Sequence, residues 1–392
     1  MRRDEKKLTR LRDGMRTEGF TALVLRVPEN VSYVSDFWPG RGLSYLILPI
    51  DKDPILIHPA GEHLTQTWVS DVRLYKWETY EHLGNSLKEG TLQVERALGD
   101  LGRGTGRIGI EEEWESFLGT PLRYEMSAMG AKTAAALRRE LTAYEVQNAS
   151  QLVIRARAIK TELEVRALKK ANRIARAGLE AFERNLKPGL TEIELSCRIE
   201  HEIITEGIEK ANANRVVACA FVASGRSTAE AYKYAIGNSK RRIRRGEPVM
   251  LELDVVADGY SSDTTRTYVV GQPSRRQKEL LEAVLDSERS AIAAIRPSTL
   301  AADIARTSND VIEKHGLAKY LVHRLGHGIG VAVHEPIPAL HIESKDVLEA
   351  GMVHSVEPGI YGERIGGFRI EDDILDTASG TQYLSNFPPI QE

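Results

Sequence analysis

The stretch that decides the fold is Met250-Leu-Glu-Leu-Asp254-Val-Val-Ala-Asp258-Gly259-Tyr-Ser-Ser-Asp263-Thr-Thr-Arg-Thr-Tyr-Val-Val. Asp258-Gly259 lies between two runs of β-prone residues, and this dipeptide is a strong signal for a two-residue hairpin turn. We therefore expect an antiparallel hairpin built from strands over residues 249–256 and 260–270.

Two carboxylates of this hairpin are candidates for chemistry. Asp254 ends an apolar run, where an ionised carboxylate is costly unless it is paired or bound to a metal. Asp263 lies on the returning strand within reach of Asp254. The alternative is that Asp254 caps a turn and that Asp263 forms an Asx-turn with the threonines after it.

Histidines gather farther along the chain, where six of the ten lie between residues 315 and 354. His323, His327 and His334 are spaced by 4 and 7 positions. Gly326 and Gly328 flank the middle one and let the backbone come close to a ligand, so His327 is well placed as an imidazole ligand. A single histidine is more often an ordinary surface or core residue, but nearby carboxylates favour the metal interpretation.

Two glutamates lie in apolar, strand-like runs near the end of the chain. Glu357 follows Met-Val-His-Ser-Val, and Glu371 follows Gly-Gly-Phe-Arg-Ile. Arg369 and Glu371 are two positions apart, so in a strand they share one face of the sheet.

Composition limits the classes of protein to consider. The 392 residues include 53 Lys and Arg against 56 Asp and Glu, a net charge of -3 that argues against a dedicated nucleic-acid or anionic-membrane binder. Cys197 and Cys219 are too few for a disulfide framework, which fits a reducing cytosol. No apolar leader or membrane-length apolar run occurs. We expect a cytoplasmic protein.

The order of local signals predicts two domains. The first ~150 residues alternate helix-like and strand-like segments, as in a small α/β domain. Residues 132–185 consist almost wholly of strong helix formers, with a break where Thr161 and Glu164 fit a capping box. We therefore predict domains over residues 1–158 and 159–392. In the second, we expect helices over about 162–186, 276–295 and 302–315, with glycine-rich strands to the end.

The candidate residues together resemble the metallopeptidases of the pita-bread fold, the family of methionine aminopeptidase, aminopeptidase P and prolidase. The resemblance implies that two divalent metal ions bind to Asp254, Asp263, His327, Glu357 and Glu371. Asn30-Val31-Ser32-Tyr33 is similar to a pattern in the N-terminal domain of prolidase and aminopeptidase P. The implied fold is an α/β creatinase-like N-terminal domain followed by an α+β pita-bread catalytic domain.

The resemblance also implies roles for individual residues. Glu357 is both ligand and proton acceptor, His334 supports the tetrahedral intermediate, His323 lines a proline pocket and takes part in catalysis, and Arg369 binds substrate or orients Glu371. A donor set of four carboxylates and one imidazole suits Mn, Co, Fe or Zn, and we favour Mn or Zn. His341 and His354 are interpreted as structural residues or as residues at the rim of the site.

Two features depart from the family pattern. The family's two aspartates usually stand eleven positions apart, whereas Asp254 and Asp263 stand nine apart, a difference of two that keeps the side-chain parity of a strand. Tyr232 falls where the family has a substrate-binding histidine. A phenol can donate a hydrogen bond to substrate, but it shuttles protons poorly at neutral pH. Lys233 is either a contact for a substrate carboxylate or a solvent-exposed charge.

The leading functional hypothesis is a peptidase that cleaves the Xaa-Pro bond of dipeptides, as prolidase does, or of peptide N-termini, as aminopeptidase P does. The alternative is a metal-dependent hydrolase of another small amide or cyclic amidine, similar to ectoine hydrolase. A metal-free creatinase-like enzyme or a binding protein fits less well, because the chain keeps the full ligand set. The resemblance also implies a homodimer in which Trp38 and Arg41 approach the partner's site. The alternative is that Trp38 packs in the interior of its own domain and that Arg41 is a solvent-exposed charge.

Overall fold

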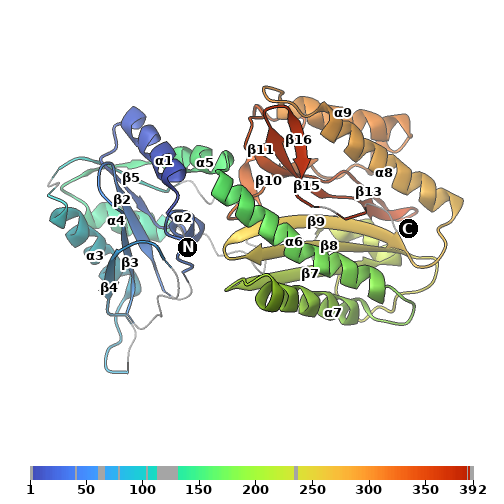
Figure 1. Ribbon diagram of the computed structural model, residues 1–392, viewed down its shortest axis with the longest axis horizontal. Coiled ribbons are helices and arrows are strands. Elements are labelled where there is room, and N and C mark those ends of the chain that lie inside the picture. Colours follow the sequence, from blue (N-terminus) through green and yellow to red (C-terminus); the bar gives the residue numbers. More distant parts are fainter. Residues whose placement is uncertain are drawn as a thin grey trace. The chain divides into compact units, whose positions relative to one another are not determined.

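The computed structural model describes residues 3–39, 42–60, 67–77, 80–102, 105–112, 131–233, 237–385 and 387–388. The chain divides into two compact units, Met1–Arg157 and Ala158–Glu392 (Figure 1). Arg41, which we expected near a dimer partner's site, lies outside the described residues. In the part of the chain that is described, no helix is both long and apolar enough to span a membrane.

The first unit is built on a mixed six-stranded sheet in the order β4-β3-β2-β1-β5-β6. At its centre, β1 runs antiparallel to β2 and parallel to β5, and every residue of β1 is buried. The described strands are β1 (Ala22–Leu25), β2 (Tyr45–Pro49), β3 (Ile55–Pro59), β4 (Asp71–Tyr75), β5 (Arg107–Ile110) and β6 (Glu145–Asn148). The described helices are α1 (Glu5–Glu18), α2 (Pro28–Ser35), α3 (Ser86–Asp100), α4 (Ala131–Glu140) and α5 (Ser150–Ala158).

A buried polar network fixes the position of Asn30, the first residue of the Asn-Val-x-Tyr pattern. The Asn30 amide donates to Glu111 Oε1 at 2.6 Å, and its carbonyl oxygen accepts from Arg157 Nη1 at 2.6 Å. Glu111 Oε2 accepts from the backbone N–H groups of Arg26 and Val27. Asn30 therefore links Glu111, which follows β5, to Arg157 near the end of α5. The Asn-Val-x-Tyr pattern thus has a structural role in this unit.

The prediction of almost continuous helix over residues 132–185 is wrong in one place. Residues 145–148 form the edge strand β6, paired in parallel with β5, before α5 begins. Hydrogen bonding to the sheet outweighs a weak local preference for helix, which a propensity argument cannot detect.

The second unit consists of two helix-covered sheets (Figure 1). Helices α6 (Glu162–Asn185) and α7 (Glu192–Thr205) pack on the antiparallel sheet β7-β8-β9, whose strands are β7 (Val216–Ser224), β8 (Pro248–Ala257) and β9 (Tyr260–Val269). Helices α8 (Arg275–Ala294) and α9 (Ala301–Lys314) pack on the sheet β11-β10-β12-β15-β16. Its strands are β10 (Gly326–Gly328), β11 (Glu335–Leu340), β12 (Val353–Val356), β15 (Asp372–Thr377) and β16 (Gly380–Tyr383), and a separate hairpin is formed by β13 (Gly359–Gly362) and β14 (Gly366–Arg369).

The expected hairpin is present as β8 and β9. Asp258 and Gly259 both have positive φ, 50° and 88°, as a two-residue turn between antiparallel strands requires. Side chains alternate along β8, so Leu251, Leu253 and Val255 join the core under the helices while the residues between them face the other sheet. The hairpin thus separates an apolar face from a polar one.

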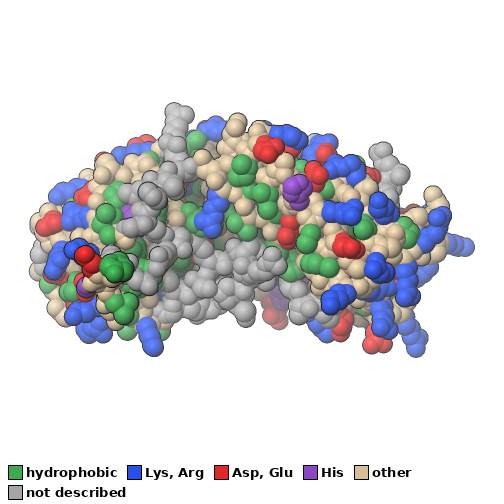
Figure 2. All heavy atoms as spheres, turned by 90° about the horizontal axis from the view of Figure 1, so that it is seen from below, with side chains coloured by type: hydrophobic (Ala, Val, Ile, Leu, Met, Phe, Trp, Pro, Cys, Tyr) green, Lys and Arg blue, Asp and Glu red, His purple; other side chains and the backbone are tan. Residues whose placement is uncertain are grey.

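The surface drawn in Figure 2 carries charges of both signs. Lys and Arg side chains have Asp and Glu side chains among them on this face.

Candidate metal centre

The polar face of the hairpin presents two carboxylates directly opposite each other. Asp254 and Asp263 are register partners in the β8–β9 ladder, and each is only 1% exposed. Because opposite residues of an antiparallel pair point to the same face, both carboxylates enter the space between the two sheets. The interpretation of Asp254 as a simple turn cap does not fit, since the turn lies at Asp258 and Gly259.

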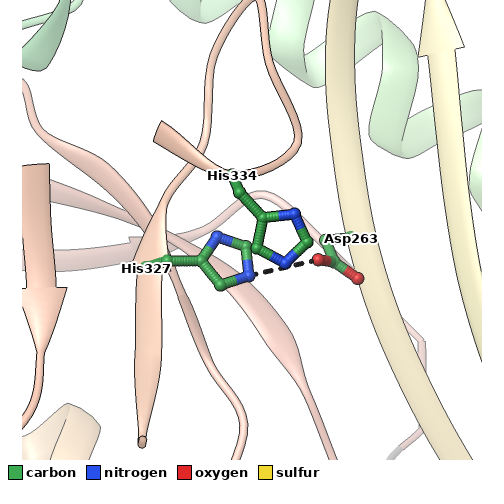
Figure 3. Close-up of side chains that lie close together, drawn as sticks. All are labelled: Asp263, His327 and His334. Carbon is green, nitrogen blue, oxygen red and sulfur yellow. Dashed lines mark ion pairs between the residues drawn. The ribbon is translucent and has the colours of Figure 1, made fainter. Parts of the chain in front are cut away.

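His327 comes from the facing sheet and is held as a metal-binding tautomer. Its Nδ1 lies 3.0 Å from the carbonyl oxygen of Gly328, so this nitrogen carries the proton and Nε2 keeps its lone pair. Nε2 lies 3.4 Å from Asp263 Oδ2 and 3.5 Å from Glu357 Oε1, and the first of these pairs is drawn as a dashed line in Figure 3. The imidazole thus aims a free lone pair at two carboxylates.

The glycines around His327 are required by the packing of the backbone. A Cβ at Gly326 would lie 2.2 Å from the carbonyl oxygen of Ser355, and one at Gly328 would lie 2.3 Å from that of Ile337. Strand β10 therefore fits between β11 and β12 only because these positions lack side chains.

Two glutamates complete the cluster from different elements. Glu357 follows β12, and Ser355 Oγ donates to its Oε1 at 3.4 Å. Glu371 lies between β14 and β15 and is fully buried, and Thr265 of β9 donates to its Oε2 at 2.6 Å. All five residues predicted as ligands meet in one place.

The electrostatics of the cluster call for cations. Burial, together with the neighbouring carboxylates, raises the pKa values of Asp263 and Glu357 well above the usual range, and burial raises the pKa of Glu371. Burial and the nearby His334 lower the pKa of His327, which keeps the imidazole neutral and able to coordinate. Among the described residues, Asp263 Oδ1 and Glu371 Oε1 have no hydrogen-bond partner.

The donor atoms fall into three sets that could each hold a metal ion, with ligand atoms within 4.8 Å of one another. The sets are Asp263, His327 and His334; His327, Glu357 and Glu371; and Glu252, Asp254 and Asp263. Hard oxygen donors with one or two imidazoles suit divalent first-row metals. The residues therefore fit the metal ions that the resemblance implies.

His334 lies beside His327, with ring centroids 4.0 Å apart (Figure 3). It is partly exposed, whereas His327 is buried. This position at the rim of the cluster is suitable for contact with a bound substrate.

A second group of residues borders the ligands. His323 Nδ1 lies 2.7 Å from the carbonyl oxygen of Arg324, so Nε2 is free to accept from the Tyr361 hydroxyl at 3.1 Å. Tyr361 in turn accepts from Arg369 Nη1 at 3.1 Å. The ring of Tyr232 meets that of Tyr361 edge to face, which places Tyr232 beside the same pocket.

Other candidates have roles away from the cluster. Lys233 is exposed and pairs with Glu230 at 2.7 Å, which favours the interpretation as a surface charge. His354 is fully buried, and its Nε2 lies 3.1 Å from Asp376 Oδ1, so it ties β12 to β15. Trp38 belongs to the first unit, and its approach to a dimer partner's site stays a prediction.

Sequence reasoning missed three residues of the site. Thr265 joins Arg369 to Glu371, because Arg369 Nε donates to its hydroxyl at 2.8 Å while the hydroxyl donates to Glu371. Tyr361 ends the sequence Glu-Pro-Gly-Ile-Tyr, and the sequence analysis predicted no role for it. Glu252 forms an ion pair with Arg369, and it stands eleven positions before Asp263, which is the spacing of the two aspartates in the family that the sequence resembles.

Two helix-covered sheets enclosing a cluster of buried carboxylates and imidazole define a metallohydrolase domain. A model of metallopeptidase family M24 matches residues 166–378, and one of the creatinase/prolidase N-terminal domain matches residues 7–159. The chain belongs to metallopeptidase family M24. This confirms the resemblance and the fold class, an α/β creatinase-like domain followed by an α+β pita-bread catalytic domain.

Individual relatives span nearly the whole chain. An Xaa-Pro dipeptidase of Pyrococcus furiosus is 29% identical over 381 residues, which cover 97% of this chain and 98% of that protein. The structure of an Xaa-Pro dipeptidase from Bacillus anthracis has a TM-score of 0.79 at 28% identity, covering 98% of this chain and 99% of that one. The prolidase of Pyrococcus horikoshii has a TM-score of 0.78 at 27% identity with the same coverage.

Proposed function

We propose that this metallopeptidase uses two divalent metal ions to hydrolyse the peptide bond between an N-terminal residue and proline, in dipeptides or at the N-termini of longer peptides. The observation that carries the proposal is the convergence of Asp254, Asp263, His327, Glu357 and Glu371 on one buried space. The names of the relatives, Xaa-Pro dipeptidase and prolidase, support the choice of bond.

The metal ions would supply Lewis-acid polarisation of the scissile carbonyl and a water of lowered pKa. Glu357 is placed to accept the proton of the attacking water, since burial raises its pKa well above the usual range and its two oxygens face His327 and His323. His334, at the rim of the cluster, is placed to donate a hydrogen bond to the developing oxyanion. One carboxylate, Glu357, thus handles proton transfer, and one imidazole, His334, stabilises the developing charge.

The proline side of the substrate would meet His323, Tyr361 and Tyr232. These rings lie 5.2–5.3 Å apart between centroids and offer an aromatic wall to a pyrrolidine ring. Burial lowers the pKa of His323, so its imidazole is neutral at physiological pH and suits contact with an apolar pyrrolidine ring.

The direct test is hydrolysis after metal removal and add-back of manganese, cobalt or zinc. An Xaa-Pro dipeptide, an Xaa-Pro tripeptide and a matched dipeptide without proline are compared. Metal-restored cleavage of either proline peptide supports the proposal, and the preferred length distinguishes a dipeptidase from an aminopeptidase. Cleavage of none of the three, by a protein that binds metal, would refute it.

One observation favours a second candidate, a hydrolase of another small amide or cyclic amidine. Tyr232 stands where the family that the sequence resembles has a substrate-binding histidine. A phenol would therefore contact the substrate in place of an imidazole. Metal-dependent hydrolysis of a cyclic amidine such as ectoine, with no cleavage of proline peptides, would support this candidate instead.

A homodimer and a cytoplasmic location remain predictions from the sequence. Light scattering coupled to size-exclusion chromatography measures the first, and cell fractionation the second.

A further inference from the structure

We propose that a cavity at the start of the 3₁₀-helix η3 (Gly225–Lys233) binds a small molecule that carries a phosphate group, and that its occupancy strengthens substrate binding through Tyr232. The cavity has a volume of about 560 Å³, and its lining residues are Arg226, Ser227, Ser239, Arg241, Arg244 and Glu247. None of them is a predicted metal ligand. The inference therefore goes beyond the proposed function.

The cavity borders the most basic six-residue stretch of the chain, Lys240-Arg-Arg-Ile-Arg-Arg245. Its only apolar residue, Ile243, is 1% exposed and belongs to the core beneath α6 and α7. The backbone N–H of Ile243 donates to the carbonyl oxygen of Leu190 at 2.8 Å. This anchor fixes the backbone of the stretch, and the charged side chain of Arg244 beside it stays at the surface.

An ion pair forms one side of the cavity. Arg241 Nη2 pairs with Glu247 Oε1, and both side chains are about one-fifth exposed. Glu247 Oε2 accepts from the backbone N–H of Arg244 at 3.1 Å. The carboxylate of Glu247 is therefore already bound on both oxygens, and it compensates the charge of Arg241.

The buried acid next to the cavity is also satisfied. Glu192 is fully buried and accepts four hydrogen bonds. Ser224 donates from its backbone N–H and its hydroxyl at 2.8 and 2.7 Å, and Ser239 from its own at 3.1 and 2.6 Å. The negative charge of Glu192 thus needs no further cation from the cavity.

Two cations of the cavity remain uncompensated. The side chains of Arg226 and Arg244 are exposed, and neither has an ion-pair or hydrogen-bond partner among the described residues. Arg226 comes from η3 and Arg244 from the turn before β8, so the two guanidinium groups reach the cavity from different elements. Guanidinium binds phosphate oxygens in bidentate pairs, and a phosphate group carries up to about two negative charges at neutral pH. Two arginines therefore match one phosphate group in charge.

The size of the cavity favours a small molecule over a nucleic acid. Sites for small molecules span roughly 300–1,000 Å³, and this cavity lies within that range. The net charge of -3 also argues against a polyanion as the partner.

The helix that supplies Arg226 also carries Tyr232, in its last turn. Between them, Thr228 is fully buried, and its hydroxyl accepts from the backbone N–H of Gly367 in β14 at 2.7 Å. Gly367 is the register partner of Tyr361, whose ring contacts that of Tyr232. A ligand that holds Arg226 in place would therefore order the helix that positions Tyr232 and lower the entropy cost of binding substrate.

Calorimetric titration of the metal-loaded full chain with inorganic phosphate and with pyrophosphate tests the site. We expect Arg226→Met and Arg244→Met each to weaken binding by at least about tenfold. Arg275→Met is the matched control, an exposed arginine of the same unit that pairs with Glu279 and does not line the cavity. Anions bound only to the metal ions would bind all these variants as they bind the wild type, and that result would overturn the site.

A surface for nucleic acid predicts a different pattern. Lys240 and Arg245 belong to the basic stretch but not to the lining of the cavity. Lys240→Met and Arg245→Met should therefore leave phosphate binding unchanged. Tighter binding of a single-stranded RNA oligonucleotide than of pyrophosphate, weakened by these two substitutions as much as by Arg226→Met, would overturn the small-molecule site.

The effect on substrate is measured as KM for an Xaa-Pro dipeptide with and without phosphate. We expect phosphate to lower KM by about threefold in the wild type and to have no such effect in the double variant R226M/R244M. Any effect of phosphate on the metal ions is common to both proteins, so an equal response would overturn the coupling. Calorimetry needs no cleavage of peptides. Failure of the proposed function would therefore be seen separately from failure of this site.

Discussion

The rings of Tyr232 and Tyr361 meet edge to face with centroids 5.2 Å apart, and the Tyr361 hydroxyl lies 3.1 Å from both His323 Nε2 and Arg369 Nη1. Tyr232, which the resemblance places where the family has a histidine, is therefore in contact with the chain of hydrogen bonds that reaches the predicted ligands. Its substitution should affect substrate binding before it affects metal binding.

Tyr232→Phe and Tyr232→Ala separate the two contributions of this side chain. Phenylalanine keeps the ring contact and removes the hydroxyl, so we expect a loss of about fivefold to tenfold in kcat/KM, corresponding to about 1 kcal/mol for one hydrogen bond. Alanine also removes the edge-to-face contact and should raise KM further. Steady-state kinetics on an Xaa-Pro dipeptide measures both. Tyr383→Phe, on the exposed strand β16, is the control, and equal kinetics for Tyr232→Ala and wild type would contradict the assignment.

Gly326→Ala should damage the centre through the backbone. The added Cβ would meet the Ser355 carbonyl oxygen at 2.2 Å, so β10 must shift and His327 with it, at a cost of about 1–3 kcal/mol for overpacking. Scanning calorimetry and Mn²⁺ binding should both show the loss. Gly99→Ala is the comparison: a Cβ there meets nothing within 4 Å at the next-to-last position of α3, so we expect no loss of stability. Unchanged Mn²⁺ affinity in Gly326→Ala would argue against the tight fit.

Metal binding should release protons, and its stabilising effect should grow with pH. The folded-state pKa values of Asp263, Glu357 and Glu371 are raised, so in the metal-free protein their contribution to stability is present at low pH and is lost as pH rises from about 4, the usual carboxylate range, through the raised values. Metal ions replace those protons. The difference in melting temperature between metal-loaded and chelator-treated protein should therefore be larger at pH 8 than at pH 5. Calorimetric titration in buffers of different ionisation enthalpy counts the protons, and a value of zero would contradict the coupling.

Asn30→Ala tests the polar network of the first unit. The substitution removes one hydrogen bond from Glu111 and one from Arg157, both buried, and we expect a loss of about 2–4 kcal/mol for breaking hydrogen bonds to buried charged groups. Chemical denaturation measures it, and Arg96→Ala on the exposed face of α3 is the control. Metal content should stay at two ions per chain, since the change lies in the other unit.

Local sequence signals predicted the hairpin well and the facing sheet poorly. Asp258-Gly259 sets both the turn and the register, so the meeting of Asp254 and Asp263 follows from neighbouring residues. The approach of His327, Glu357 and Glu371 depends on strands that pair across long stretches of chain, and only the resemblance anticipated it. Strand β6 was missed because its pairing with β5 is not encoded in residues 145–148 themselves. Glu252 was missed because it shares one face of β8 with Asp254, so the alternation of the strand does not distinguish the two acids.

The β8–β9 hairpin also has a consequence for the order in which the centre forms. Asp254 and Asp263 are brought together by closing a loop of a few residues. His327 and Glu371, in contrast, are separated from Asp263 by 64 and 108 positions in the sequence. Loop-closure entropy rises with that distance, so the hairpin half of the centre should survive loss of the ions while the other half loosens. In protein treated with a chelator, amide hydrogen exchange should accordingly become faster in β10 and β12 and remain slow in β8 and β9. The metal ions would then bind last, to a domain in which the β8–β9 hairpin has already formed.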